Sequence, residues 1–300
     1  MATEPKKKRP FTLANTDVRP YVYGGLAACV AEALTFPIDT AKTRLQLQGQ
    51  KIDSRYSLQT PYEGMLNVWK RIIREEGFSR LYRGLSPALL RQASYGTIKF
   101  GLYYSVKEHM PGKEGPLRNV ASAVFAGSVS SAIANPTDVL KVRLQSQIAA
   151  TSSVTLVAGF REIYSAEGLR GLWRGVIPTA ERAAIVAGVQ LPVYDYVKAY
   201  LLRNKMLTDG AANHLVSSFL AGAMACLVSS PIDVVRTRFM SQRRSDSRVY
   251  RNSFHCAFLT IKTEGIRALY KGVIPAFMRM GPWNVVFFLV YERLKKTITD

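Results

Sequence analysis

The chain has 300 residues, and its 41 Lys and Arg against 21 Asp and Glu leave a formal net charge of +20. Because 48% of the residues are apolar, the chain is not a disordered basic tail, which could not bury enough surface to fold. Three widely spaced cysteines and only three histidines argue against a disulfide scaffold, a zinc finger and a histidine metal centre. A chain this basic binds either nucleic acid or a membrane surface, and the distribution of its charges decides between them.

Three short motifs recur in the same order three times along the chain. The first reads PIDTAKTRLQ, PTDVLKVRLQ and PIDVVRTRFM, beginning at Pro37, Pro136 and Pro231. The second reads EEGFSRLYRG, AEGLRGLWRG and TEGIRALYKG, and the third reads YYSVK, YDYVK and YERLK. The chain therefore divides into a polar basic tail (1–20) and three repeats (21–111, 117–205 and 212–300), which we expect to form one integral domain.

The first long segment of each repeat is apolar enough to cross a bilayer as a helix. These segments are 20–38, 119–137 and 210–232, and about twenty apolar residues suffice to span the hydrocarbon. Glu32 is the only charged residue in the first segment, and the second has none. Small residues at close spacing, such as Gly127 and Ser131, let helix backbones approach each other in lipid.

The second long segment of each repeat also has spanning length but carries charges. These segments are 85–106, 176–197 and 273–291, and the charges at Arg91, Arg182 and Arg279 occupy equivalent positions. The alternative, a soluble bundle, usually has helices with a charged outer face. The chain is therefore predicted to be an all-α membrane protein with six transmembrane helices in three pseudo-symmetric repeats.

Basic residues gather in the connections within the repeats. Segments 44–83, 143–174 and 236–271 contain 8, 4 and 9 of them, whereas the connections between repeats contain three each. An even number of spans puts the long loops on one side and both termini on the other, and the basic side is the one that is not translocated. In the first loop Met65, Trp69, Ile72 and Ile73 lie at helical spacing, which predicts a short helix along the surface.

The first motif places an acidic and a basic residue three positions apart, next to a proline that should kink the helix. Around a threefold axis each acid can reach the base of the next repeat, which would close a pore on the loop side. This arrangement is preferred to local pairs within one helix. The predicted pairs are Asp39 with Lys141, Asp138 with Arg236, and Asp233 with Lys42.

The third motif predicts a second and weaker ring at the opposite end. Its members are Tyr104, Lys107, Asp195, Lys198, Glu292 and Lys295. Tyr104 stands where the other repeats have an acid, so Lys198 is expected to lack an acidic partner. A ring of partial strength suits a gate that opens and closes.

Three arginines are predicted to lie between the two rings. Arg91, Arg182 and Arg279 each precede the lysine of the third motif by sixteen residues, or about 24 Å of helix. Charged groups at this depth are costly and face a cavity, whereas snorkelling to the interface would need a position nearer a helix end. Planar guanidinium groups match the oxygens of carboxylate, sulfate or phosphate, so the triad predicts a site for a small divalent anion.

Two further charged residues are weaker candidates for the same site. Glu32 could neutralise one arginine, or it could carry a proton together with the anion, because burial raises the pKa of a carboxyl group. Lys99 lies eight residues after Arg91 and could line the same cavity.

The repeated motifs resemble the mitochondrial carrier family over nearly the whole chain, from about Tyr21 to Lys296. The resemblance implies six tilted helices with three short matrix-side helices, alternating access, and termini toward the intermembrane space from the inner mitochondrial membrane. Segments such as LLRQASYGTIK, LPVYD and GPWN are similar to the uncoupling-protein-like group, and within it to the carriers of brain and kidney. That group is related to dicarboxylate and oxoglutarate carriers.

The resemblance also implies what is transported. Dicarboxylates, sulfate, thiosulfate or phosphate would be exchanged, and the alternative is a proton leak activated by fatty acids. The three arginines fall on the family's substrate-contact positions, and Glu32 matches an acidic position of uncoupling proteins. No cofactor is implied, and we expect a functional monomer.

The resemblance further assigns structural roles. Gln46 and Gln145 match glutamines that brace the matrix ring from below, whereas Met240 replaces the third. Cardiolipin is implied at the starts of the even-numbered helices, where helix N-termini and basic groups favour phosphate. These positions are Arg83-Gly84, Arg174-Gly175 and Lys271-Gly272.

Two other functional classes find little support. The segment PKKKRP at 5–10 could contact nucleic acid, but neither an aromatic platform nor a recognition helix accompanies it, so a solvated tail is the preferred interpretation. An enzyme is not expected either, because the sequence has no nucleotide-binding glycine motif and no plausible set of nucleophile, histidine and acid.

Overall fold

The computed structural model describes residues 19–49, 64–109, 115–146, 155–242, 250 and 252–299. These residues form helices and connecting turns, with no β-strand among them. The six long helices are α1 (Arg19–Leu47), α4 (Leu85–His109), α5 (Pro116–Ser146), α8 (Val176–Arg203), α9 (Ala211–Ser241) and α11 (Val273–Thr299). Each repeat thus contributes two long helices, as the sequence predicts.

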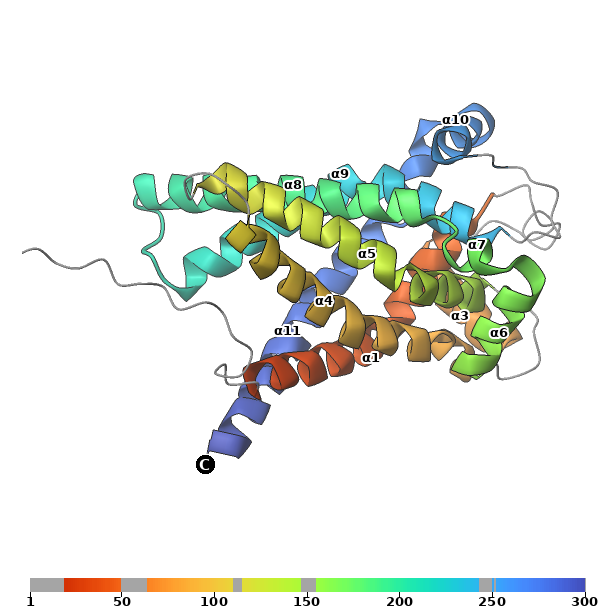
Figure 1. Ribbon diagram of the computed structural model, residues 1–300, viewed down its shortest axis with the longest axis horizontal. Helices are drawn as coiled ribbons and strands as arrows, with labels where there is room; N and C mark the ends of the chain where they lie inside the picture. The colour runs from red at the N-terminus through yellow and green to blue at the C-terminus, as the bar shows by residue number, and fades with distance from the viewer. Residues whose placement is uncertain are drawn as a thin grey trace, which may run out of the picture.

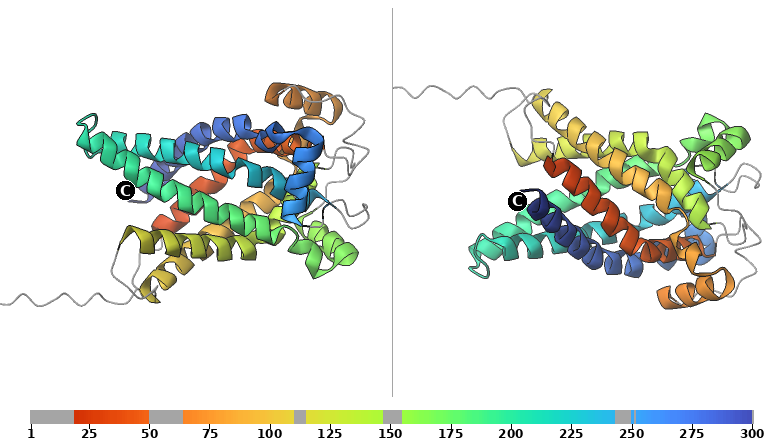
Figure 2. Two further views of the ribbon diagram at one scale, coloured as in Figure 1. Left: turned by 90° about the horizontal axis from the view of Figure 1, so that it is seen from above. Right: turned by 90° about the horizontal axis from the view of Figure 1, so that it is seen from below.

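The six long helices surround a central space in chain order, and α11 packs against α1 to close the ring. They separate toward the end where the C-terminus lies and converge toward the end that carries the short helices (Figures 1 and 2). The first long helix of each repeat (α1, α5 or α9) contacts the other two, which brings the first motifs together. Charged side chains of the three repeats therefore meet at the converging end.

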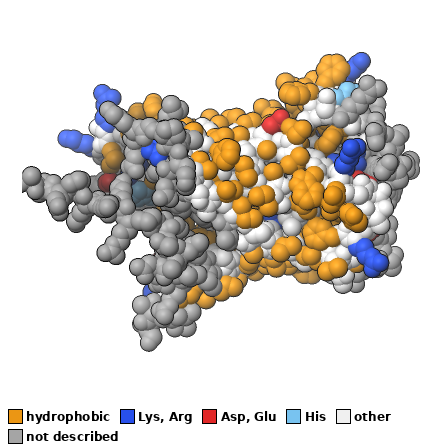
Figure 3. Space-filling model, viewed as in Figure 1, with side chains coloured by type: hydrophobic (Ala, Val, Ile, Leu, Met, Phe, Trp, Pro, Cys, Tyr) orange, Lys and Arg blue, Asp and Glu red, His pale blue; other side chains and the backbone are white. Residues whose placement is uncertain are grey.

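Polar and apolar side chains are distributed opposite to those of a soluble bundle. Glu32 and Asp39 are buried, whereas Leu34, Phe125 and Phe219 are more than half exposed. Hydrophobic side chains cover the middle of the face seen in Figure 3, and Lys and Arg lie mainly toward its ends. Such a surface fits the hydrocarbon of a bilayer.

Average hydropathy along the sequence identifies only some of the six long helices as membrane spans. Two helical segments within the described residues, Ala212–Ser241 and Ile266–Lys296, are long and apolar enough to span a membrane by composition alone. The other long helices carry charges on their inner faces, such as Glu32 and Arg91, which lower their average hydropathy.

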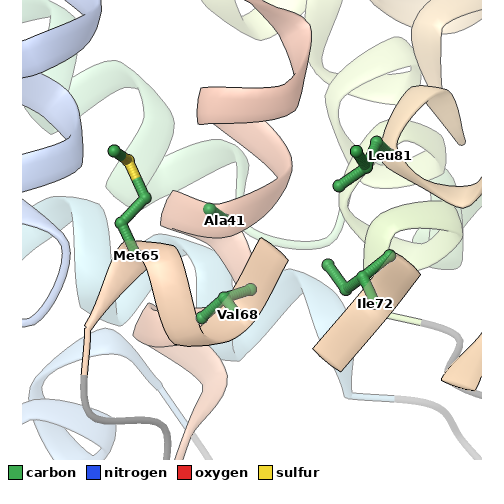
Figure 4. Packing of buried hydrophobic residues seen from close by; sticks show 5 residues of the cluster. All are labelled: Ala41, Met65, Val68, Ile72 and Leu81. Carbon is green, nitrogen blue, oxygen red and sulfur yellow. The ribbon is translucent and has the colours of Figure 1, made fainter. Parts of the chain in front are cut away.

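Each repeat has a short amphipathic helix on the loop side. These are α3 (Met65–Glu75), α6 (Leu156–Glu167) and α10 (Ser253–Glu264), each followed by one further helical turn: η2 (Phe78–Tyr82), α7 (Leu169–Leu172) or η3 (Ile266–Tyr270). In α3, Met65, Val68 and Ile72 are buried and pack with Ala41 of α1 and Leu81 (Figure 4). The helix predicted in the first loop is confirmed, and Ile73, one of the residues at helical spacing, lies off its buried face. It is 46% exposed, because positions 65, 68 and 72 form the stripe that faces α1.

Buried arginines join each short helix to the long helices. In every repeat the last basic residue of the first motif pairs with the glutamate of the second: Arg44 with Glu76, Arg143 with Glu167, and Arg238 with Glu264. The same guanidinium groups also donate to backbone carbonyls of the next repeat. Arg238 donates to the carbonyl of Gln46 at 3.0 Å, which satisfies an acceptor in the last turn of α1.

We expect Glu264→Gln to lower the thermal stability of the detergent-solubilised protein strongly, and Glu75→Gln to lower it little. Arg238 is fully buried, and removing one member of a buried pair costs about 3–5 kcal/mol. Glu75 forms an exposed pair with Arg71 within α3, and such pairs contribute about 0–1 kcal/mol. Equal losses in the two variants would contradict the proposed importance of the buried pair.

The Glu264 contribution should also depend on pH. Burial alone would raise the pKa of Glu264, but hydrogen bonds from Arg238 and Lys271 outweigh it and lower that pKa. The stabilisation is therefore present above the unfolded pKa of about 4.3 and is lost as the pH falls below it. Melting curves of wild type and Glu264→Gln should approach each other in acid, and a constant difference down to about pH 3 would contradict this assignment.

Candidate functional site

All six long helices line a cavity of about 170 Å³ near the converging end. Six cationic and four anionic side chains line it, an unusual density of charge for a protein interior. They include all three arginines of the predicted triad and all six residues of the predicted loop-side ring, together with Glu32. The structure thus brings four of the five residues predicted for the anion site, and all of the loop-side ring, to one place.

The loop-side ring is formed between the predicted partners. The Lys141 ammonium lies 2.7 Å from a carboxylate oxygen of Asp39. Lys42 lies 2.8 Å from Asp233, and Arg236 pairs with Asp138. Each pair joins neighbouring repeats, so the ring closes the converging end of the molecule.

The three arginines differ from the prediction in their partners. They do not stand apart from the ring, because each one pairs with a ring aspartate of a different repeat. Arg91 lies 2.6 Å from Asp138, whereas Arg182 pairs with Asp233 and Arg279 pairs with Asp39. A partly buried guanidinium group is costly without an anionic partner, and the nearest carboxylates supply that partner here.

Each ring aspartate is therefore shared between two cations. Asp39 of the first repeat holds Lys141 of the second and Arg279 of the third. Asp138 holds Arg236 and Arg91, and the same cyclic order applies to the third aspartate. The three ring cations and the three arginines therefore share the same three carboxylates.

Glu32 breaks this symmetry. Its carboxylate lies 2.7 Å from Arg279 and 3.2 Å from Lys141, and it accepts a hydrogen bond from Gln92 at 3.1 Å. Of the two roles that the sequence left open, the structure shows the arrangement needed to neutralise one arginine. With every group ionised, four carboxylates face six cations in this cavity, which leaves an excess of two positive charges.

The two glutamines lie beneath the ring as the resemblance implied. The Gln145 amide donates to Asp39 at 3.1 Å, and its oxygen accepts from Thr43 at 2.8 Å. The oxygen of Gln46 accepts from Thr237 in the same way. At the third interface the equivalent residues, Met240 and Val142, are both apolar and belong to one hydrophobic cluster.

At the opposite end, the prediction that Lys198 lacks an acidic partner is wrong. It lies 3.1 Å from Asp209 in the connection before α9, whereas Asp195 and Glu292 are exposed. The repeat motifs could not show this pair because Asp209 lies outside them. Lys295 is exposed too, and the side chains of Lys99, Tyr104 and Lys107 lie outside what the structure describes.

The helices α4, α8 and α11 are each preceded by a glycine with a positive φ angle. Gly84, Gly175 and Gly272 have φ values of 91°, 78° and 93°, which glycine adopts without strain. A cavity of about 790 Å³ opens beside Arg174 and Gly175 and reaches Phe239 on α9. Part of the basic charge is already engaged, since Arg174 donates to the carbonyl of Gln242 and Lys271 pairs with Glu264.

Comparison with known proteins agrees with this geometry. The sequence signature described as mitochondrial carrier protein matches three consecutive segments, residues 15–114, 112–205 and 208–300. The chain is 49% identical over 284 residues to kidney mitochondrial carrier protein 1 of Xenopus laevis, covering 93% of this chain and 97% of that protein. It is 39% identical over 283 residues to mitochondrial substrate carrier family protein ucpB of Dictyostelium discoideum, covering 92% and 94%.

We expect a third glutamine brace to require changes on both sides of its interface. Met240→Gln alone would bury an amide opposite Val142 and should destabilise the protein by about 1–3 kcal/mol. Val142→Thr supplies the hydroxyl present at Thr43 and Thr237, so the double variant should recover about 1 kcal/mol. A double-mutant cycle of thermal stability with no favourable coupling would contradict the proposed bracing geometry.

Proposed function

Because the chain belongs to the mitochondrial carrier family, whose members are transporters, we propose that it exchanges small divalent anions across the inner mitochondrial membrane. The observation that carries the proposal is the excess of two positive charges in the central cavity. A dianion would neutralise this excess, and the planar guanidinium groups offer paired donors to carboxylate, sulfate, thiosulfate or phosphate oxygens.

The shared aspartates suggest how binding drives alternating access. An anion that enters from the wide end takes the arginines as partners and withdraws them from Asp39, Asp138 and Asp233. Each carboxylate then keeps only its ring cation and loses the bond to an arginine of the other repeat, so fewer cross-repeat ion pairs hold the loop side closed. The ring can open toward the loops while the ring at the other end forms.

The same coupling favours exchange over one-way transport. Without an anion the arginines return to the aspartates and hold the loop-side ring closed, so the empty carrier crosses between its two states slowly. A second anion restores the crossing. At the opposite end, Lys198 pairs with Asp209 while this gate is open. When the gate closes, Lys198 would leave Asp209 and join the ring.

The proposal also covers the orientation of the protein in the membrane, the bound lipid and the oligomeric state. The basic loops with α3, α6 and α10 face the matrix, and both termini face the intermembrane space, in accord with the charge asymmetry. Cardiolipin occupies the starts of α4, α8 and α11, where helix N-termini lie beside basic residues. One chain supplies every helix around the cavity, so the transport unit is a monomer.

We expect Arg182→Gln combined with Arg279→Gln to lower anion exchange at least about tenfold, because two of the three guanidinium groups for the anion are lost. Uptake of labelled sulfate and malonate into proteoliposomes loaded with the same anions measures the effect. Arg161→Gln, an exposed change on α6, is the matched control and should exchange like the wild type. Full exchange by the double variant would exclude the proposed site.

The second candidate function is a proton leak activated by fatty acids, in which Glu32 carries the proton. The ion pairs of Glu32 with Arg279 and Lys141 favour the exchange function, because they make this carboxylate part of the charge balance of the anion site. We expect Glu32→Gln to raise the uptake of trivalent anions relative to divalent ones, since the charge excess becomes three. Proton conductance that responds to fatty acid and disappears in Glu32→Gln, with little exchange in the wild type, would favour the leak.

A further inference from the structure

The excess positive charge is not spread evenly around the central cavity. Asp39 and Glu32 together face Lys141 and Arg279, so this part of the cavity is balanced. By contrast, Asp138 alone faces Arg236 and Arg91.

The third aspartate also faces two cations without the help of a second carboxylate, because Asp233 alone faces Lys42 and Arg182. The two surplus charges therefore lie on the side of Arg91 and Arg182, away from the balanced group around Arg279. An anion is attracted most strongly to that side.

A second cavity of about 240 Å³ opens on this side, between α4, α5 and α8. Arg91, Arg182 and Arg236 line it and also line the central cavity, so the two spaces are adjacent. Six apolar residues of α5 and α8 form part of the remaining wall: Ala123, Gly127, Ala183, Val186, Ala187 and Leu191. The uncharged residues Tyr95, Ser131, Thr179 and Gln190 complete it. The cavity therefore has a cationic end and an apolar stretch of wall that suits a short hydrocarbon branch.

Sequence differences among the repeats bear on the space beside the arginine of the second repeat. The residue after each arginine is Ala183 in the second repeat, Gln92 in the first and Met280 in the third. Gln92 is bonded to Glu32, and the Met280 side chain lies against Gly222 of α9. Ala183 has no atoms beyond Cβ, so the corresponding space stays open.

We propose that the anion binds off the threefold axis, with its charges at Arg91 and Arg182 and an apolar carbon branch in the cavity between α4, α5 and α8. The substrate class is then a small dicarboxylate with a short alkyl branch, whereas an inorganic oxyanion would use only the cationic end. The inference rests on the proposed exchange function and adds a location and a substrate class to it.

The test compares two leucines introduced two positions apart on α5. Ala123 lines the cavity, whereas Ala121 is exposed on the outer face of the same helix. Exchange of sulfate, malonate and ethylmalonate is measured in proteoliposomes for the wild type, Ala123→Leu and Ala121→Leu. Ala187→Leu fills the same cavity from α8 and provides a second filling variant.

We expect the wild type to exchange ethylmalonate at least as well as malonate. Both filling variants should lower the ethylmalonate-to-malonate ratio by about tenfold, the effect of a steric change of one or two carbons in a pocket, and leave the sulfate-to-malonate ratio unchanged. Ala121→Leu should leave both ratios unchanged. Rejection of ethylmalonate by a wild type that exchanges malonate and sulfate would overturn the inference and spare the proposed function.

Equal losses for all three anions in the filling variants, or the same ratio change in Ala121→Leu, would also overturn the inference. A wild type that exchanges none of the three anions would overturn the proposed function itself. The two failures are thus distinguishable in one set of measurements.

Discussion

The structure depends on three buried aspartates that each serve two cations. Carboxylates inside a membrane protein are costly unless they are paired, and here every pair crosses from one repeat to another. Cations of the ring and arginines of the candidate site compete for the same oxygens. A change at the site therefore acts on the closure of the converging end without an intermediate element.

This competition also explains why the arginines are engaged by carboxylates while the loop-side ring is closed. The arginines need an anionic partner, and the carboxylates that line the cavity with them are those of the ring and Glu32. The helices are held together at the converging end by cross-repeat contacts, whereas they separate toward the opposite end (Figure 2). Closure at one end and opening at the other thus follow from where the aspartates lie.

The three repeats differ in charge, polar bracing and side-chain volume, and these differences break the threefold symmetry. Glu32 balances the cations near Arg279, Met240 and Val142 replace a polar brace by apolar packing, and Ala183 leaves space where other repeats are filled. Each departure changes one interface and leaves the others intact. A symmetric scaffold can therefore hold an asymmetric ligand, because its three sectors differ in charge and volume.

Much of this arrangement could be predicted from the sequence, because the repeats supply their own register. The pairing of Asp39 with Lys141 follows from three equivalent helices around an axis, and the structure confirms it. The pairing of the arginines with the ring aspartates was missed, because helix spacing alone does not show how far the arginine side chains reach toward the ring. The pair of Lys198 with Asp209 was missed because one member lies outside the repeated motifs.

The buried pairs such as Arg238 with Glu264 were missed for a different reason. Both residues belong to repeated motifs, but they lie 26 positions apart on different helices, and only the docking of α10 brings them together. The periodicity of the first loop located a helix correctly, yet it could not rank Val68 above Ile73 as the buried residue. Packing direction is a tertiary property that spacing alone does not determine.

The most direct measurement of the central claim is the exposure of the converging end when an anion binds. Met240 is fully buried, and it lies one turn beyond Arg236 toward the loops, so Met240→Cys reports the opening of the ring. Cys29 and Cys226 would be replaced by serine, whereas Cys256 can remain, because burial raises the pKa of its thiol to about 12.

The rate at which an impermeant thiol reagent modifies the Met240→Cys variant from the loop side is then compared with and without saturating malonate. We expect slow modification of the empty protein, acceleration of about tenfold or more by malonate, and no acceleration when Arg182→Gln is added. Equal rates with and without malonate, or equal acceleration in the Arg182→Gln background, would contradict the coupling of the site to the ring through shared aspartates.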